Sequence, residues 1–189
     1  MNERQAKVIE AAKKSFSMFG YKATTVDQIA KIAGVGKGTI YTYFSNKEEL
    51  LQAIVRTLVS EMRETADNAV EPDKSFSENL HKGIYGILIY RKEHALLLKL
   101  ADEVREIGTQ AAKDALQQFE NEVVNYIKKR LDVAIEKGKY TDCHTELVAF
   151  VMYKTYISLV VDWEKNHEPL SNEEVLLFVK QYFLNRLEY

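Results

Sequence analysis

Apolar side chains recur at helical spacing through almost the whole chain of 189 residues, and the alternation typical of β-strands is nearly absent. The first apolar stripe consists of Ile9, Ala12, Phe16 and Phe19. Gly20 follows it, at the place where a helix is expected to end. Only two prolines, Pro72 and Pro169, interrupt the rest of the chain. The sequence therefore predicts an all-α fold with about nine helices.

Capping boxes mark where several of these helices begin, because a Ser or Thr three residues before Gln or Glu satisfies the first free backbone N–H groups. Such pairs are Thr25 with Gln28, Ser45 with Glu48, Ser75 with Glu78 and Ser171 with Glu174. The predicted helices cover about 3–19, 25–33, 37–44, 45–70, 75–91, a shorter stretch to 107, 109–136, 142–166 and 171–189. Pro72 breaks the chain after the fourth helix. By function we divide the chain into a domain of residues 1–50 and a domain of residues 51–189.

Charge is distributed unevenly along the chain. The net charge is −2, but residues 1–56 hold nine basic and five acidic residues, so this part carries +4 and the remainder −6. A basic N-terminal part followed by an acidic remainder indicates that the chain has two functions. Cys143 is the single cysteine, and no signal peptide or membrane-spanning stretch is visible, so we expect a cytoplasmic protein with no membrane partner.

The segment GVGKGTIYTYF, residues 34–44, lies between two short predicted helices, which is the layout of a helix-turn-helix. Ile40 and Phe44 are expected to face inward from the second of these helices. The outward residues are then Lys37, Gly38, Thr39, Tyr41, Thr42 and Tyr43. One cation with several hydroxyls and aromatic edges suits phosphate oxygens and base edges in a DNA major groove.

Nucleotide binding is the alternative interpretation of these glycines, and the spacing does not support it. A P-loop with Gly36-Lys37 as its GK has Lys31 in place of the first glycine and Gly38 in place of the metal-binding hydroxyl. A Rossmann fingerprint fails because the third glycine would fall at Thr39 or Tyr41. The four histidines are scattered, so no metal site, cofactor or catalytic group is predicted. We therefore expect no enzyme activity.

Residues 24–50, TTVDQIAKIAGVGKGTIYTYFSNKEEL, resemble the DNA-binding motif of the TetR family of bacterial transcriptional regulators. The resemblance implies a homodimeric repressor that binds a palindromic double-stranded operator and is released by a small ligand. The DNA contacts that it implies fall on Thr25, Lys37, Gly38, Thr39, Tyr41, Thr42, Tyr43 and Lys47. Two positions depart from the common pattern, because Gly36 stands where serine is frequent and Thr42 where histidine is frequent.

The two last predicted helices are apolar on more than one face, so they need cover on more than one face. A two-fold four-helix interface between two copies would provide it, and the resemblance implies the same homodimer. The remaining possibility is a purely intrachain core.

An effector pocket is expected among the helices of the second domain. The candidate lining residues are Leu80, Ile84, Ile87, Leu88, Phe119, Val123, Tyr126, Phe150 and Lys154. Lys154 either extends to water or faces the pocket to pair with an anion; His81, Tyr85 and Arg130 are further polar candidates. Such a lining favours a hydrophobic or amphipathic effector, such as a lipid, an acyl compound or a drug. The alternative is a DNA-binding helical dimer without small-molecule control.

Overall fold

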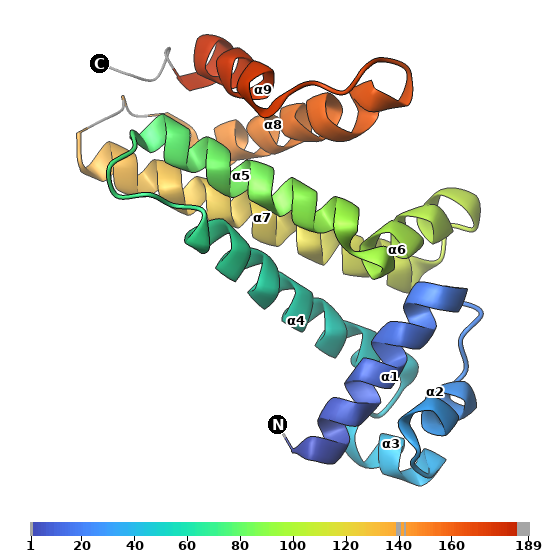
Figure 1. The fold of residues 1–189 in the computed structure, drawn as a ribbon. Coiled ribbons are helices and arrows are strands. Elements are labelled where there is room, and N and C mark those ends of the chain that lie inside the picture. Colours follow the sequence, from blue (N-terminus) through green and yellow to red (C-terminus); the bar gives the residue numbers. More distant parts are fainter. Residues whose placement is uncertain (1, 139–140, 142, 185–189) are drawn as a thin grey trace. The chain divides into compact units, whose positions relative to one another are not determined.

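The computed structural model describes residues 2–138, 141 and 143–184 of the chain (Figure 1). Within these residues all regular structure is helical, with nine α-helices and a few short π and 3-10 segments. The predicted all-α class and the helix count are therefore confirmed. In the described part of the chain, no helix combines the length and the apolar character that crossing a membrane requires.

The chain packs as two compact units. Unit 1 contains Met1–Ser60 and Arg91–Phe119, and unit 2 contains Glu61–Tyr90 and Glu120–Tyr189. The boundary therefore falls inside a helix, α4 (Lys47–Asn68), which begins in one unit and ends in the other. The functional division at residue 50 is a different kind of boundary and stays a prediction.

Unit 1 is built around the N-terminal helices. Its elements are α1 (Glu3–Phe19), α2 (Val26–Ala33), α3 (Lys37–Tyr43), the first part of α4, the last residues of α5 (Phe76–Glu93), α6 (Ala95–Glu106) and the first part of α7 (Gln110–Glu136). Its core contains Val8, Ala12, Phe16, Ile29, Ile40, Leu50 and Ile54, all nearly inaccessible to solvent. Because these residues come from four helices, the short helices α2 and α3 are held by burial rather than by their own length.

Helix α4 is capped one residue later than the sequence predicted. The N-cap pair is Asn46 with Glu49, since Asn46 Oδ1 accepts from the Glu49 N–H at 2.8 Å and Glu49 Oε2 accepts from the Ser45 N–H at 2.7 Å. The Phe44 N–H still donates to Ile40 O, 2.9 Å away, so the chain leaves α3 only after Phe44. This leaves Ser45 as a connecting residue, and the capping box predicted at Ser45 and Glu48 is wrong.

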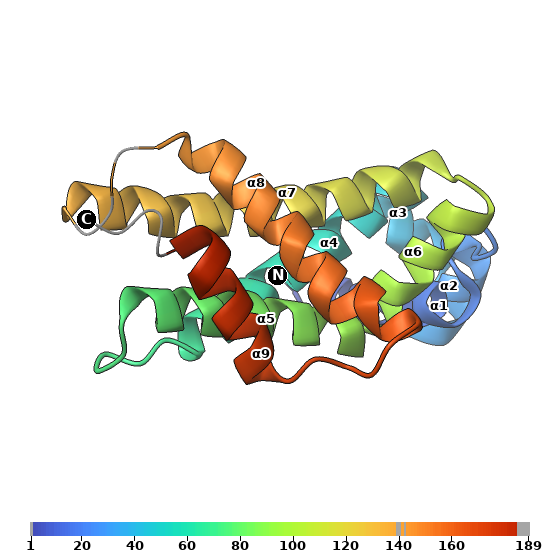
Figure 2. The same ribbon diagram turned by 90° about the horizontal axis from the view of Figure 1, so that it is seen from above.

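Unit 2 is formed by longer helices. Its elements are the end of α4, most of α5 (Phe76–Glu93), most of α7 (Gln110–Glu136), α8 (Thr145–Ile157) and α9 (Asn172–Val179). Helices α8 and α9 form a layer over α5 and α7 (Figures 1 and 2). The capping boxes predicted at Ser75 and at Ser171 are confirmed by reciprocal hydrogen bonds with Glu78 and Glu174.

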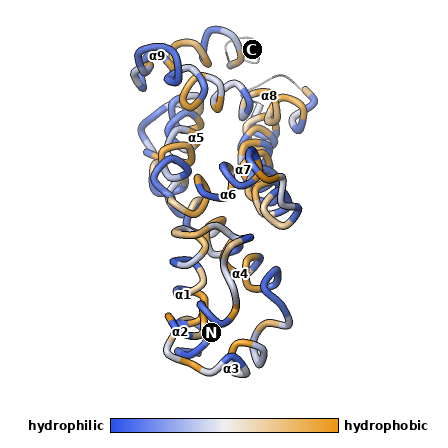
Figure 3. Tube along the Cα trace, turned by 90° about the vertical axis from the view of Figure 1, so that its right-hand side faces the viewer, coloured by the Kyte–Doolittle hydropathy of each residue, from blue (hydrophilic) through white to orange (hydrophobic). Residues whose placement is uncertain are grey.

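The helix predicted over 142–166 is shorter and less regular than expected. It begins at Thr145, where His144 accepts from the Leu147 N–H, and after Ile157 it continues as a π segment and a 3-10 turn. Position 142 and positions 185–189, which were predicted to be helical, lie outside the described residues. Apolar residues occur along much of α8 in the hydropathy view (Figure 3).

Candidate functional site

The glycine segment forms the turn of a helix-turn-helix. Gly34 adopts the left-handed conformation, with φ +66°, and ends α2 by donating its N–H to the last carbonyls of that helix. Gly36 precedes α3 in an extended conformation. Thr25 and Gln28 form the predicted capping box at the start of α2. Local sequence signals therefore fix both ends of α2 and the entry to α3.

Helix α3 has one buried and one exposed face. Ile40 is 2% exposed and Tyr41 is 47% exposed. Lys37, Gly38, Tyr41 and Thr42 lie on the outer side, and we call these four residues the recognition face. An added Cβ at Gly38 would meet no atom within 4 Å, so the backbone there is open to an approaching partner. Thr39 and Tyr43, which were also predicted to face outward, are less exposed than these four residues and are half-buried.

Lys37 already has an anionic partner in the structure. Its ammonium group donates to Asp27 Oδ2 at 2.9 Å, and both side chains are exposed. This hydrogen bond and the charge of Asp27 raise the pKa of Lys37. A DNA phosphate that bound Lys37 would therefore take the place of a carboxylate.

Three of the predicted contact residues also make hydrogen bonds within the protein. Thr42 Oγ1 donates to Gly38 O at 3.0 Å, and the Tyr43 hydroxyl accepts from Asn2 Nδ2 at 3.2 Å. The Thr25 hydroxyl caps α2. These bonds orient the side chains and leave lone pairs or protons for a further partner.

Lys47 differs from the other predicted contact residues because its ammonium group points into the protein. It donates to Tyr21 O at 2.8 Å and Thr24 O at 2.9 Å, and it lies 4.2 Å from the centre of the Tyr21 ring. Burial lowers the pKa of Lys47 and raises the pKa of Tyr21 to about 12. The structure thus gives Lys47 a role in holding the α1–α2 loop; its contact with DNA stays a prediction.

Glu103 supports the same loop from α6, although it was not among the residues predicted from the sequence. The residue is 5% exposed, and its carboxylate accepts from the Lys22 N–H at 3.1 and 3.2 Å. Leu96 and Leu100 are buried on the same helix, so Glu103 continues an apolar stripe. A carboxylate in such a stripe was the signal that could have identified it, because a buried charge requires hydrogen-bond donors.

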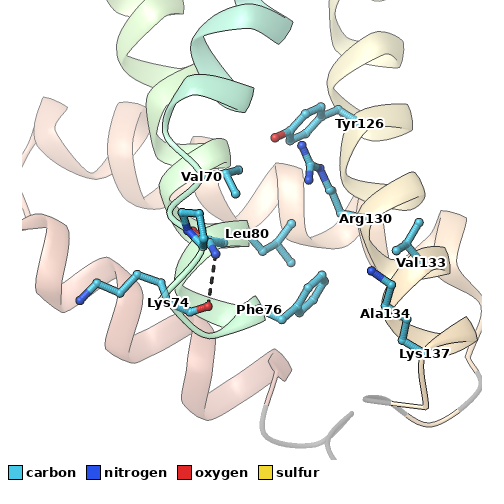
Figure 4. Close-up of a pocket in the computed structure, with 11 residues that line it drawn as sticks. Val70, Lys74, Phe76, Leu80, Tyr126, Arg130, Val133, Ala134 and Lys137 are labelled. Atoms are coloured by element: carbon cyan, nitrogen blue, oxygen red, sulfur yellow. Dashed lines mark hydrogen bonds between the residues drawn. The ribbon is translucent and has the colours of Figure 1, made fainter.

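Unit 2 contains a cavity of about 250 Å³ between the end of the α4–α5 connection, α5 and α7 (Figure 4). Phe76 and Leu80 line it from α5, and Tyr126, Arg130 and Val133 line it from α7. Of the predicted pocket residues, Leu80, Tyr126 and the polar candidate Arg130 lie here. Val133 and Lys137, one turn apart, and Lys74, in the α4–α5 connection, were missed because only the packing of that connection and α5 against α7 brings them together.

The other predicted pocket residues lie elsewhere. Ile84, Ile87, Leu88, Phe119 and Val123 are packed in the core and are at most 1% exposed. Phe150 and Lys154 are exposed on α8, where the Lys154 ammonium donates to Glu120 Oε2 at 2.8 Å. Lys154 therefore has the solvent-facing arrangement that was one of its two predicted options. Among the described residues, no group of three or more acidic, His or Cys side chains is arranged to hold a metal ion.

Comparisons with known proteins agree with this geometry. Residues 8–54 match the model of a family described as bacterial regulatory proteins, tetR family. The uncharacterised HTH-type transcriptional regulator YhgD of Bacillus subtilis (strain 168) is 47% identical over 185 residues, covering 98% of this chain and 97% of that protein. The HTH-type transcriptional repressor KstR2 of Mycobacterium tuberculosis (strain ATCC 25618 / H37Rv) is 25% identical, covering 93% and 88% of the two chains.

A solved structure shares the fold over nearly the whole length. The fatty acid degradation regulator FadR from Bacillus halodurans superposes with a TM-score of 0.69 at 21% identity, and the match covers 96% of this chain and 94% of that one. At this identity the likeness concerns the fold alone. The family model, the sequence relatives and the solved structure therefore agree with one another, and all of them are described as regulatory proteins.

Proposed function

Because the chain belongs to the tetR family of bacterial regulatory proteins, we propose that it is a homodimeric repressor that binds a palindromic operator and is released by a small effector. Its relatives and its fold are those of transcriptional regulators with a helix-turn-helix, not of enzymes. We place this activity in the cytoplasm, where the DNA is. The effector that we propose is hydrophobic or amphipathic, of the lipid, acyl or drug type.

The recognition face of α3 is the observation that carries the proposal of DNA contact. It combines a cation, an exposed aromatic edge, a hydroxyl and an open glycine backbone on a helix that begins directly after a tight turn. A recognition helix of this kind enters a major groove with its N-terminal residues toward the bases. The charge of +4 over the first 56 residues favours the approach to a polyanion.

Selection of bound fragments from genomic DNA, followed by binding measurements at several salt concentrations, tests this proposal. We expect fragments that share a palindrome, because a two-fold dimer places two recognition helices about one helical turn, roughly 34 Å, apart. We also expect affinity to fall steeply with salt. Absence of any selected fragment, or binding that ignores salt, would contradict the proposal.

An exposed apolar surface on α8, α9 and the π segment Lys180–Leu184 supports the proposal of a homodimer. Its members are Leu147, Phe150, Val151, Leu177, Phe178 and Tyr182, with exposed fractions between 38% and 65%. The opposite side of α8 is also apolar and is buried through Met152, Tyr153 and Tyr156. A helix that is apolar on two sides needs a second covering surface, and a matching copy of the same surface provides one.

The dimer proposal is tested by measuring the mass of the protein in solution with the variant Phe150→Glu and the control Glu164→Gln. We expect the parent and the control to be dimers and Phe150→Glu to shift toward monomers, because a charge would be buried in an apolar interface. A monomeric parent would refute the dimer.

Control by an effector is supported by the cavity of unit 2 and by the role of one protein with the same fold. FadR of Bacillus halodurans is a fatty acid degradation regulator, and this chain has its fold. A cavity lined by apolar side chains and a few charged ones is the usual form of a small-molecule site. These two observations favour ligand control over a DNA-binding dimer that no small molecule regulates.

A further inference from the structure

The cavity of unit 2 is cationic although the surrounding part of the chain is acidic. Residues 57–189 carry a net charge of −6. Among the described residues that line the cavity, however, every charged one is a base, namely Lys74, Arg130 and Lys137. In Figure 4 the amino group of Lys74 points away from the cavity, so Arg130 and Lys137 are the cations closest to it. This local charge favours an anionic ligand.

Arg130 is prepared for an anion by two neighbours. Its guanidinium carbon lies 5.1 Å from the centre of the Tyr126 ring, and its Nη2 donates to Asp67 Oδ1 at 2.5 Å. The ring beneath it restricts the guanidinium group, and the five N–H donors of that group match a carboxylate or a phosphate. The single bond to Asp67 leaves other donors on Arg130 for a ligand.

The opposite wall of the cavity is apolar. Phe76 and Leu80 extend from α5 toward Arg130 and Val133 of α7 (Figure 4). The volume of about 250 Å³ is below the roughly 300–1,000 Å³ of a site for a drug-sized molecule. The cavity therefore fits a short apolar skeleton with one charged end.

We propose that this cavity binds a small amphiphilic anion, with a carboxylate or phosphate head at Arg130 and an apolar skeleton against Phe76, Leu80 and Val133. The head competes with Asp67 for the guanidinium group. Asp67 lies in the last turn of α4, so the ligand removes a contact that ties the end of α4 to α7. The consequence for DNA affinity rests on the proposed function, whereas the binding itself does not.

Calorimetric titration of the full chain with four probes tests the charge and the skeleton together. The probes are octanoate, octyl phosphate, 1-octanol and octylamine. We expect one or both anions to bind at least about tenfold more tightly than 1-octanol, because a charge-assisted hydrogen bond is lost with the neutral probe. The tighter anion identifies the head group. Equal binding of 1-octanol or octylamine would refute the proposal.

Two variants test whether the head group of the ligand replaces Asp67 at Arg130. The probe is octanoate or octyl phosphate, whichever binds more tightly. Arg130→Gln should weaken binding about tenfold or more. Asp67→Asn should strengthen it roughly two- to fivefold, because the competing carboxylate is removed and exposed ion pairs are weak. If Asp67→Asn weakened binding as Arg130→Gln does, the ion pair would only support the cavity and the competition would be wrong.

Arg63→Gln is the matched control. It breaks another ion pair between α4 and α7, that of Arg63 with Glu122, and Arg63 is not among the residues that line the cavity. We expect it to leave the affinity for the probe unchanged within about twofold, since a surface ion pair contributes little to the fold. Loss of binding in Arg63→Gln equal to that in Arg130→Gln would indicate a general loosening of α4 and refute a ligand contact. Circular dichroism of each variant verifies folding.

The DNA measurement separates the two proposals. If the protein binds selected fragments but none of the anionic probes, the proposed function stands and the anion site is wrong. If it binds the anion but no fragment, the site stands and the proposed function fails. If both bind, we expect the anion to lower DNA affinity in the parent and not in Arg130→Gln; an equal decrease in both would refute the role of Arg130.

Discussion

The recognition face in unit 1 and the cavity in unit 2 both present a cation that is held by an aspartate. Lys37 pairs with Asp27 on an open surface, and Arg130 pairs with Asp67 beside a cavity that has one apolar wall. Lys37 has a flexible stem and a point charge, which suits a long polyanion whose phosphates recur along a groove. Arg130 has a flat group that lies over the Tyr126 ring, which suits a single head group of defined shape. We therefore expect these two ion pairs to serve different partners because their surroundings differ.

Among the proposed variants, we expect the largest effect on stability where Glu103 contacts the α1–α2 loop. Gly20 has φ +85° and ψ 163°, and an added Cβ would lie 2.8 Å from Glu103 Oε2. Gly20→Ala should therefore lower the free energy of unfolding by about 3 kcal/mol, since it adds backbone strain and disturbs the carboxylate that holds the Lys22 N–H. Urea denaturation measures this.

Gly34→Ala is the control for that change. Gly34 also has a positive φ, but nothing lies within 4 Å of an added Cβ. We expect a loss of about 1 kcal/mol from the backbone alone. Equal losses at the two glycines would mean that Glu103 does not constrain the loop, and that unit 1 is supported by its apolar core only.

The contact of Lys37 with DNA is the next effect in size. Lys37→Ala should weaken binding to all selected fragments by roughly tenfold at low salt and reduce the salt slope by about one, because one phosphate contact is removed. Lys129→Ala, which removes an exposed charge from α7, should leave the slope unchanged. An unchanged slope in Lys37→Ala would show that the recognition face is wrongly assigned. The affinity for octanoate should be the same in both variants.

Removing the aspartate beside Lys37 has a smaller effect of opposite sign. Asp27→Asn should raise DNA affinity roughly two- to fivefold, since it removes a competitor for the ammonium group and one negative charge near the phosphates. Fluorescence anisotropy with a selected fragment measures this. A lower affinity would mean that Asp27 positions Lys37 for DNA instead of competing with DNA, and the parallel with Asp67 would be broken.

The smallest expected effect is a pH dependence of the unfolding free energy, which arises from a histidine of unit 2 that does not line the cavity. His81 is buried, with Nδ1 2.8 Å from the Tyr156 hydroxyl and Nε2 2.6 Å from Asn172 Oδ1. Burial lowers the pKa of His81 below its ordinary value of 6.5, and Lys180 acts in the same direction, while the Asn172 contact and Glu173 oppose the shift. The neutral imidazole is therefore the form that the folded state prefers.

The sign of this effect follows from proton binding. The unfolded chain, where His81 has its ordinary pKa, binds more protons below pH 6.5 than the folded one does, so the unfolding free energy decreases as pH falls through that value. Above pH 6.5 the contribution is complete. Urea denaturation at pH 7.5 and 5.5 measures the decrease. It should persist in His167→Gln, which changes an exposed ring, and vanish in His81→Gln.

Much of unit 1 was predictable because its signals are local. Thr25 with Gln28 and Gly34 mark the ends of α2 through hydrogen bonds that span three or four residues, and the apolar spacing of Ile40 and Phe44 indicates which side of α3 is buried. The start of α4 was harder to predict, since Ser45 and Asn46 are both good N-caps, and the bond of the Phe44 N–H to Ile40 O extends α3 to Phe44 and leaves Asn46 as the cap. The roles of Lys47 and Glu103 depend on a loop more than twenty residues away from either.

The sequence alone thus determined the helical class, the turn and the outward residues of the recognition face, because short-range backbone hydrogen bonds and apolar periodicity depend on neighbours in the chain. Tertiary structure alone decided which cations are paired and where a cavity lies. Arg130 and Tyr126 are one turn apart, but Asp67 and Phe76 reach them only through the packing of α4, α5 and α7. Long side chains at such crossings can face solvent, a carboxylate or a ligand, and only the positions of the neighbouring helices select among these.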